Sequence, residues 1–141
     1  MISITVLCVG TLKEKWLRDA VQEYAKRIGG YARFCVKEVR SDRELIPRLS
    51  GRAYKIALCV EGVQLSSEEL AAKTGELATR GFSEIIYVIG DSDGMGEDVK
   101  AMCDFRLSFS KMTFPHQLMR VILAEQIYRS LSIINHGKYH K

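Results

Sequence analysis

The chain has 141 residues, which fits a single domain spanning residues 1–141 and leaves no room for a second hydrophobic core. Hydrophobic residues make up 47% of the sequence, so a real core is available and intrinsic disorder is not expected. Lysine and arginine total 21 against 17 aspartates and glutamates, and the resulting net charge of +4 permits an anionic partner without demanding one.

Cysteine usage and hydropathy indicate the cellular compartment of the protein. The four cysteines stand singly, with no Cys-x-x-Cys pair to clamp a metal or act as a redox couple, so we expect small buried hydrophobes in a reducing compartment. The apolar start lacks the basic region of a signal peptide, and no stretch approaches the ~18 apolar residues of a membrane span. We therefore expect a soluble, cytoplasmic protein with no membrane association.

The first forty residues predict a strand, a helix and a second strand. Residues 2–9 are rich in β-forming side chains and end at Gly10. Apolar residues then recur at helical spacing over 16–28, until a pair of glycines stops the pattern. A short strand is predicted at 34–39.

The middle of the chain predicts a third strand and a capped helix. Pro47 keeps any helix around it short or broken. Residues 54–60 form the next predicted strand, which Glu61-Gly62 ends in a turn. Residues 66–69 then have the Ser-x-x-Glu spacing of a capping box, where a helix begins. The predicted inner face of that helix consists of Leu70, Thr74, Leu77 and Ala78.

The apolar run at 85–89 is typical of a central parallel strand that is covered on both faces. A glycine-rich loop at 90–96 follows, then a brief helix at 97–103 and a short strand at 105–109. This alternation predicts an α/β fold, an open and mostly parallel sheet with helices on both faces. Ligands of such sheets bind outside the carboxyl ends of the strands, so the loops after 54–60, 85–89 and 105–109 are the places to seek chemistry.

The last predicted helix, 115–134, carries Pro115 in its first turn, where a missing N–H costs nothing. Its apolar residues surround most of the cylinder: Leu118, Met119, Ile122, Leu123, Ile127, Tyr128, Leu131 and Ile134. Such a helix needs cover on two sides, and a second copy of the same helix across a two-fold axis is the simplest candidate for the far side. The alternative is a helix that the small domain itself buries well.

The loop at 90–96 has three glycines, which allow its backbone to approach a ligand closely. It matches neither a dinucleotide-binding motif nor a Walker A loop, and Asp91 and Asp93 oppose a phosphate. A ligand with hydroxyls, an amide-rich base or a positive centre fits better. An ordinary turn is the alternative reading.

The end of the chain mixes cations with side chains that can stack on an unpaired base: Lys138, Tyr139, His140 and Lys141. This is the chemistry of single-stranded RNA recognition, and Arg120 and Arg129 on the preceding helix would extend the basic surface. A frayed, solvated terminus is the alternative. The three histidines are too few and too scattered to predict a metal site, so none is expected.

Residues 108–118, the run Glu125-Gln126-Ile127-Tyr128-Arg129 and the ending Tyr139-His140-Lys141 closely resemble the carboxy-terminal signature of the ribosomal RNA large subunit methyltransferase H family. The resemblance extends over essentially the whole chain, although the chain looks short before Tyr54. It implies a SPOUT-class methyltransferase, a homodimer whose carboxy-terminal part forms a trefoil knot around S-adenosylmethionine. Members of this family methylate N3 of a pseudouridine in helix 69 of the 23S rRNA, on the assembled ribosome.

Carried over position by position, the resemblance places the cofactor contacts on Leu58, Gly90, Phe109, Ser110, Lys111, Met112, Thr113 and Phe114. We further expect Arg129, Tyr139 and His140 to position the target base and favour its anionic form, with His140 best able to accept a proton near neutral pH. Because knotted dimers of this class build each site at the subunit boundary, the tail is expected to act on the partner's cofactor.

Two positions depart from the family pattern. Asp91 stands where many relatives carry a second glycine, and Cys59 where an aspartate is common. Asp91 could place a carboxylate near the positive sulfonium of the cofactor. Two other functions remain as alternatives: a nucleotide-dependent oxidoreductase, against which the missing G-x-G-x-x-G counts, and a non-catalytic RNA-binding module.

Overall fold

Five strands form one sheet in the order β2-β1-β4-β3-β5, and every neighbouring pair is parallel. The computed structural model describes residues 1–140. The strands are β1 (Ser3–Val9), β2 (Arg33–Val39), β3 (Tyr54–Gln64), β4 (Glu84–Ile89) and β5 (Phe105–Ser108). The helices are α1 (Lys15–Ile28), α2 (Asp42–Leu45), the 3-10 helix η1 (Ile46–Arg48), α3 (Ser67–Thr79), α4 (Glu97–Ala101) and α5 (His116–Ile134). The predicted open α/β sheet is confirmed.

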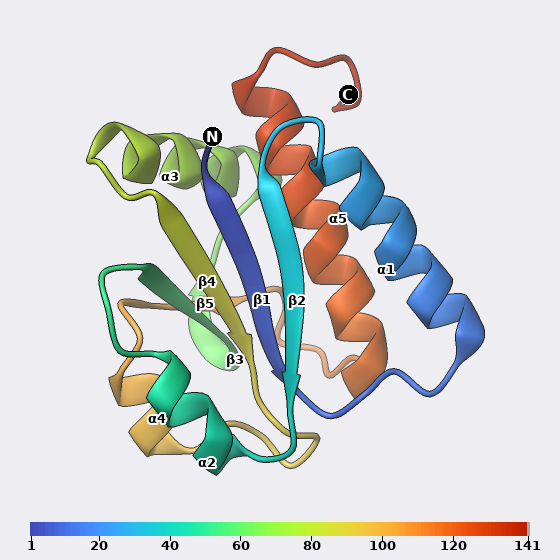
Figure 1. Cartoon of the computed structure of the whole chain (residues 1–141), viewed down its shortest axis with the longest axis vertical. Coiled ribbons are helices and arrows are strands. Elements are labelled where there is room, and N and C mark those ends of the chain that lie inside the picture. Colours follow the sequence, from blue (N-terminus) through green and yellow to red (C-terminus); the bar gives the residue numbers. More distant parts are fainter. Residues whose placement is uncertain (141) are drawn as a thin grey trace.

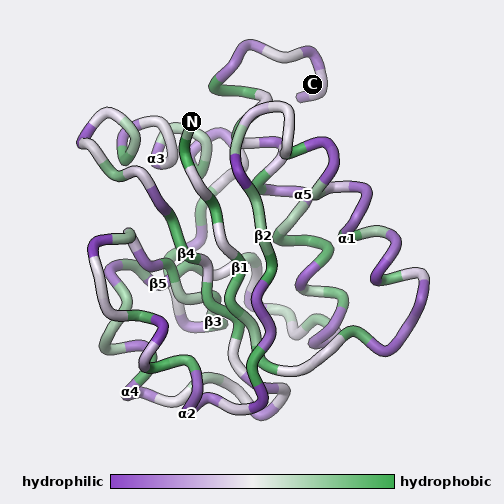
Figure 2. Tube along the Cα trace, in the orientation of Figure 1, coloured by the Kyte–Doolittle hydropathy of each residue, from purple (hydrophilic) through white to green (hydrophobic). Residues whose placement is uncertain are grey.

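Helices cover both faces of this sheet, with α1, α3 and α5 on one face and α2 and α4 on the other (Figure 1). The alternation of side chains along each strand explains the two layers. In β1, Ile4 and Val6 belong to the core beneath the three longer helices, whereas Leu7 and Val9 belong to the core beneath α2 and α4. Figure 2 shows the central strands as mostly hydrophobic tubes between helices of mixed character.

The central strand and the capped helix are both confirmed. All residues of β4 from Ile85 to Ile89 are buried, as a strand covered on both faces requires. At the start of α3, the Ser66 Oγ accepts a hydrogen bond from the Glu69 amide at 3.0 Å, and the Glu69 carboxylate accepts one from the Ser66 amide at 2.8 Å. A capping residue of this kind stabilises a helix by about 1 kcal/mol.

The turn predicted at Glu61-Gly62 is wrong, because β3 continues to Gln64. Leu58 and Val63 both pair with Leu107 of β5, so the residues between them bulge out of the ladder. A Cβ atom on Gly62 would lie 2.7 Å from the backbone of Arg106 and Leu107. The glycine thus permits a close approach of two strands and does not make a turn.

Three predictions about burial are also wrong. Ala78 of α3 is exposed, and Ala71 takes its place on the inner face. Of the four cysteines only Cys8 is buried, and Cys35 is exposed. Arg120 is only 3% exposed and lies inside the protein, so it does not extend a basic surface.

The last helix is covered largely by its own chain. No residue of α5 is exposed, because the helix contacts α1 and α3 as well as the sheet (Figure 1). Pro115 precedes the first turn as the N-cap residue, so α5 begins one residue later than predicted. The apolar circumference of the helix therefore does not by itself require a second copy. Within the described chain, no helix is long and apolar enough to cross a membrane.

Candidate active site

The carboxyl ends of β4, β3 and β5 meet at one edge of the sheet and surround a pocket of about 230 Å³. Parallel neighbours in the sheet bring these ends together, as the sequence analysis expected. Seven of the eight predicted cofactor residues line this pocket: Leu58, Gly90, Phe109, Ser110, Met112, Thr113 and Phe114. The eighth, Lys111, is not among the lining residues, and its side chain is exposed.

The loop after β5 is shaped by its own serines. Ser108 is 2% exposed, and its Oγ donates to the carbonyl oxygen of Ser110 at 3.1 Å. The Ser110 Oγ in turn accepts from the Met112 amide at 3.0 Å. These bonds fold the loop back on itself and hold its backbone against the pocket.

The loop after β4 is both a tight turn and a wall of the pocket. The Gly94 amide donates to the Asp91 carbonyl oxygen at 2.9 Å, which closes the turn. A Cβ atom on Gly90 would lie 2.8 Å from the Met95 Cβ, so a glycine is needed where the loop folds back. The far end is held by Asp42 of α2, whose carboxylate accepts from the Gly96 amide at 2.6 Å.

The charged groups at this pocket favour a ligand that is not a phosphate. The Glu61 carboxylate accepts a hydrogen bond from Lys100, and this bond lowers the pKa of Glu61, which therefore carries a negative charge at neutral pH. The Lys100 ammonium is thereby paired already, and Asp91 adds a second carboxylate to the lining. Burial raises the pKa of Cys59, the residue that stands where an aspartate is common, so its thiol stays neutral.

Several residues of the pocket were missed by the sequence analysis. Glu61 and Lys100 form its ion pair, Met95 and Met119 add apolar surface, and His116 lines its edge. The positions of His116 and Met119 follow from the start of α5, which faces the pocket. His116 lies within the 108–118 motif, and this position in the motif is the signal that could have indicated it.

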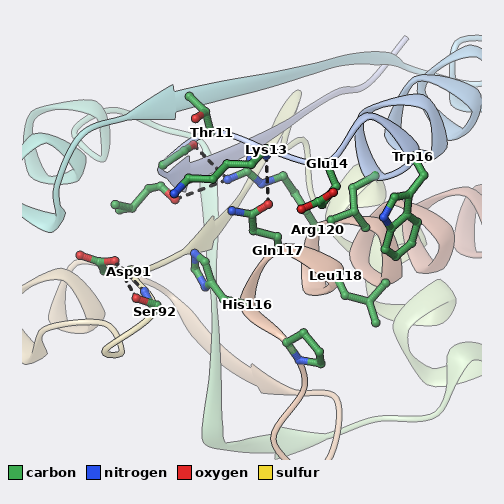
Figure 3. Close-up of a pocket in the computed structure, with 14 residues that line it drawn as sticks. Thr11, Lys13, Glu14, Trp16, Asp91, Ser92, His116, Gln117, Leu118 and Arg120 are labelled. Atoms are coloured by element: carbon green, nitrogen blue, oxygen red, sulfur yellow. Dashed lines mark hydrogen bonds between the residues drawn. The ribbon is translucent and has the colours of Figure 1, made fainter.

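A larger hollow of about 620 Å³ adjoins the pocket at the carboxyl end of β1 (Figure 3). It shares Asp91, Ser92 and His116 with the pocket, and the loop at Gly10 and the starts of α1 and α5 complete its walls. Trp16, which is 61% exposed, lines the hollow from α1. Pockets for small ligands usually enclose 300–1,000 Å³, and the two adjoining cavities together offer room for a ligand of nucleoside size.

Polar contacts of Arg120 and Gln117 fix the wall of this hollow. Arg120 of α5 donates to the Glu38 carboxylate at 2.5 Å and to the Gly10 carbonyl oxygen at 3.0 Å. The Lys13 amide donates to the side-chain oxygen of Gln117 at 3.1 Å (Figure 3). The last helix is therefore attached both to the end of β1 and to the segment that leads into α1.

The three predicted catalytic residues come together at the other end of α5. The Arg129 Nη1 lies 2.9 Å from the His140 Nδ1, and the guanidinium carbon lies 4.6 Å from the centroid of the Tyr139 ring. Because a guanidinium can only donate, Nδ1 is the acceptor and the ring proton lies on Nε2, which faces the Glu68 carboxylate at 3.4 Å. Glu125, which the sequence analysis missed, accepts from Arg129 and, at 2.9 Å, from the Tyr139 hydroxyl.

Glu125 controls the ionisation of this cluster. Its hydrogen bond and its negative charge raise the pKa of Tyr139 to about 12 and also raise that of Arg129. The tyrosine is therefore a neutral donor and the arginine a permanent cation at physiological pH. Lys138 beside them is exposed, whereas Lys141, the other cation predicted to recognise RNA, lies outside the described residues.

The pocket at the strand ends does not meet the tail cluster, formed by Arg129, Tyr139 and His140, within one chain. Met119 lines the pocket, and Arg129 lies ten residues further along α5, roughly 15 Å away along the helix axis. Figure 1 shows the tail at the end of the molecule where the strands begin. The pocket is lined instead by residues at the carboxyl ends of β3, β4 and β5. Among the described residues, no three histidines, cysteines or carboxylates gather closely enough to hold a metal ion.

Comparison with known proteins points to one family. Residues 2–140 match the family model described as predicted SPOUT methyltransferase. The ribosomal RNA large subunit methyltransferase H of Bifidobacterium adolescentis is 43% identical over 159 aligned residues, which cover 99% of this chain and 100% of that protein. Its counterpart in Bifidobacterium animalis subsp. lactis is 42% identical with the same coverage. Since this chain has 141 residues, both alignments open gaps in it.

Proposed function

This chain belongs to the SPOUT methyltransferase family, and on that premise we propose that it methylates N3 of a pseudouridine in helix 69 of the 23S rRNA. The methyl donor of this proposal is S-adenosylmethionine, and the substrate is the assembled ribosome in the cytoplasm. The similar Bifidobacterium proteins, named ribosomal RNA large subunit methyltransferase H, support the choice of rRNA. The observation that carries the proposal is the convergence of seven expected cofactor residues on one pocket at three strand ends.

The residues of the pocket fit this donor. S-adenosylmethionine supplies a methyl group on a positively charged sulfonium, which is already strongly electrophilic. Leu58 and Phe109 offer apolar surface for an adenine ring, and the carboxylates of Glu61 and Asp91 suit hydroxyls or a positive centre. The main task of the chain is to align donor and acceptor, because orientation alone contributes several kcal/mol to such a transfer.

We propose that the working site is shared between two subunits of a homodimer. The tail cluster lies roughly 15 Å from the cofactor pocket of its own chain, too far to touch a base placed there. A second subunit would bring its Arg129, Tyr139 and His140 to the first subunit's pocket. The hollow beside the pocket gives room for the target nucleotide, and exposed Trp16 suits stacking on a base.

The tail residues would prepare the base for transfer. Arg129 is a fixed cation, and its charge favours the anionic form of the pseudouridine after N3 loses its proton. Tyr139 stays protonated because its pKa is raised to about 12, and it can donate its one hydroxyl proton to a carbonyl of the base once it exchanges its hydrogen bond to Glu125. His140 is the proton acceptor in this proposal, and it must exchange its contact with Arg129 to free Nδ1.

Deletion of residues 139–141 tests this assignment. We expect the truncated protein to lose methylation of ribosomes, whereas its affinity for S-adenosylmethionine by calorimetry stays within about twofold of wild type, because the pocket lies at the other end of α5. A nicotinamide dinucleotide serves as the control ligand and should not bind. Retained turnover after truncation would contradict the role of the tail, and absence of S-adenosylmethionine binding by the wild-type protein would contradict the whole proposal.

A further inference from the structure

The excess positive charge of the chain is concentrated in one segment. Residues 33–55 contain seven lysines and arginines against three acidic residues, a surplus of four. The net charge of the whole chain is also +4, so the rest of the sequence is neutral in total. The site proposed above uses none of these cations.

The fold arranges part of this charge around a groove of about 310 Å³. Lys37 of the edge strand β2 and Arg48 and Arg52 of the following segment line it. Its floor is the sheet surface that α2 and α4 leave open, at Thr5 and Leu7 of β1 and Ile86 of β4. Because side chains alternate along a strand, Arg33 lies on the same face of β2 as Lys37.

These cations have no partner in the described part of the chain. Among residues 1–140, the side chains of Arg33, Lys37, Arg48 and Arg52 make no ion pair and no hydrogen bond, and all four are exposed. Some other exposed cations do have acidic partners, such as Lys15, whose ammonium lies 2.7 Å from the Asp19 carboxylate. The basic groove is therefore a surface of uncompensated charge that favours an anion from outside.

A hydrogen bond within the protein holds one wall of the groove in place, and another wall carries an acidic residue. Lys55 is 9% exposed, and its ammonium donates to the Gly51 carbonyl oxygen at 2.9 Å, which fixes the loop that carries Arg52. The Glu84 carboxylate also lines the groove, where it accepts a hydrogen bond from the Thr5 hydroxyl at 3.1 Å. The acid thus marks the boundary of the basic surface at the amino end of β4.

The spacing of the charges fits a polyanion. Arg33 and Lys37 are four residues apart on one strand, roughly 13 Å, so a single small anion cannot reach both. From Glu84 at the groove to Gly90 at the cofactor pocket, β4 spans roughly 20 Å. An extended nucleic acid can bridge that distance while its target base lies elsewhere.

We propose that this basic groove binds the sugar–phosphate backbone of the ribosomal RNA at a distance from the methylated base. The inference rests on the proposed function, and it adds a docking surface that is separate from the chemistry. Phosphate contacts position a protein on RNA without reading sequence, so the groove strengthens binding but does not select the base. Its contribution must decrease with salt, because each contact releases counterions.

The test is the double variant R48Q/R52Q. We expect its KM for ribosomes to rise about tenfold or more, with kcat at saturating ribosomes and the affinity for S-adenosylmethionine unchanged. The slope of log affinity for ribosomes against log salt, measured by sedimentation, should decrease by about 1.5, the value for two lost phosphate contacts. The matched control is K15Q/R80Q, which removes the same charge from two exposed side chains that already have acidic partners.

The outcomes separate this inference from the function on which it rests. Equal KM values and equal salt slopes for R48Q/R52Q and K15Q/R80Q would overturn the groove while methylation by the wild type stands. Absence of methylation by the wild type would overturn the proposed function instead. The sedimentation assay would then still show whether the groove binds ribosomes. If the wild type bound phosphatidylserine vesicles through Arg48 and Arg52 but ribosomes independently of them, the assignment to RNA would be wrong.

Discussion

The role of the Asp91 carboxylate can be tested by a single substitution. From the family resemblance we expect a glycine at this position in many relatives, and Asp91 lines the pocket that we assign to a cationic donor. Its Oδ1 accepts from the Ser92 amide at 2.7 Å, so the group is oriented by its own loop. Its charge rather than its bulk is therefore the property that matters for the ligand.

We expect Asp91→Gly to weaken S-adenosylmethionine binding about threefold, because a partly solvated carboxylate attracts a nearby cation by less than about 1 kcal/mol. Calorimetry measures this change directly. Asp93→Gly is the matched control, since Asp93 is an exposed carboxylate of the same loop that does not line the pocket. Unchanged or tighter binding in Asp91→Gly would exclude an electrostatic role for this carboxylate.

Single residues also show how far the sequence could predict the site. From the sequence we expected Arg129, Tyr139 and His140 to act as a group, and the structure brings their side chains together. It did not identify Glu125, because nothing in a helical Glu-x-x-x-Arg pair indicates that a tyrosine fourteen residues away also donates to the carboxylate. Arg120 was mistaken for a surface cation, since its partners are distant in sequence.

At the scale of elements, the sequence predicted the existence of every strand, and the central strands β1 and β4 were the clearest because they are short apolar runs in a parallel sheet. The error at Gly62 has a clear physical source. Judged only from its neighbours in sequence, a glycine after an apolar run indicates a turn. Here the glycine allows the backbone of β5 to approach β3 closely. Only the neighbouring strand reveals the difference, and the sequence does not state which strands are neighbours.

Gly62→Ala should destabilise the protein by about 1–3 kcal/mol, because the new methyl group would meet β5 backbone that cannot move aside. The midpoint of urea denaturation measures the loss. Gly75→Ala in α3 is the control, where the nearest atom to the added Cβ is 3.9 Å away and alanine favours the helix by about 1 kcal/mol. Equal effects of the two substitutions would refute the close approach of β3 and β5.

At the scale of the whole molecule, the chain separates the cofactor pocket from the residues that would act on the base. Helical periodicity predicted α5, but it did not predict that the start of the helix lines the pocket or that its end contacts the tail residues. The trefoil knot implied by the family resemblance stays a prediction, because local patterns carry no information on how a chain threads and knots are rare in general. The site shared between two subunits, here called the composite site, is likewise a proposal. It rests on the distance along α5 between the pocket and Arg129.

Mixed dimers test that composite site. One subunit would lack residues 139–141, and the other would carry Gly90→Val, which collides with Met95 at the pocket. Each homodimer should be inactive, whereas the mixture should regain up to about a quarter of the wild-type activity, because half of the dimers are mixed and each restores one of two sites. Activity that stays at zero after verified subunit exchange would refute a site shared between chains.

The contact between Arg120 and Glu38 joins positions that are 82 residues apart. The guanidinium is almost fully enclosed, while the carboxylate is 38% exposed, so the two losses are unequal. A chain without the acid would leave a cation in the interior with no counter-ion, whereas a chain without the base would lose the hydrogen bond to the Gly10 carbonyl oxygen but leave its acid in contact with water. Among descendants of this sequence, we therefore expect Arg120 to be substituted first and Glu38 only afterwards.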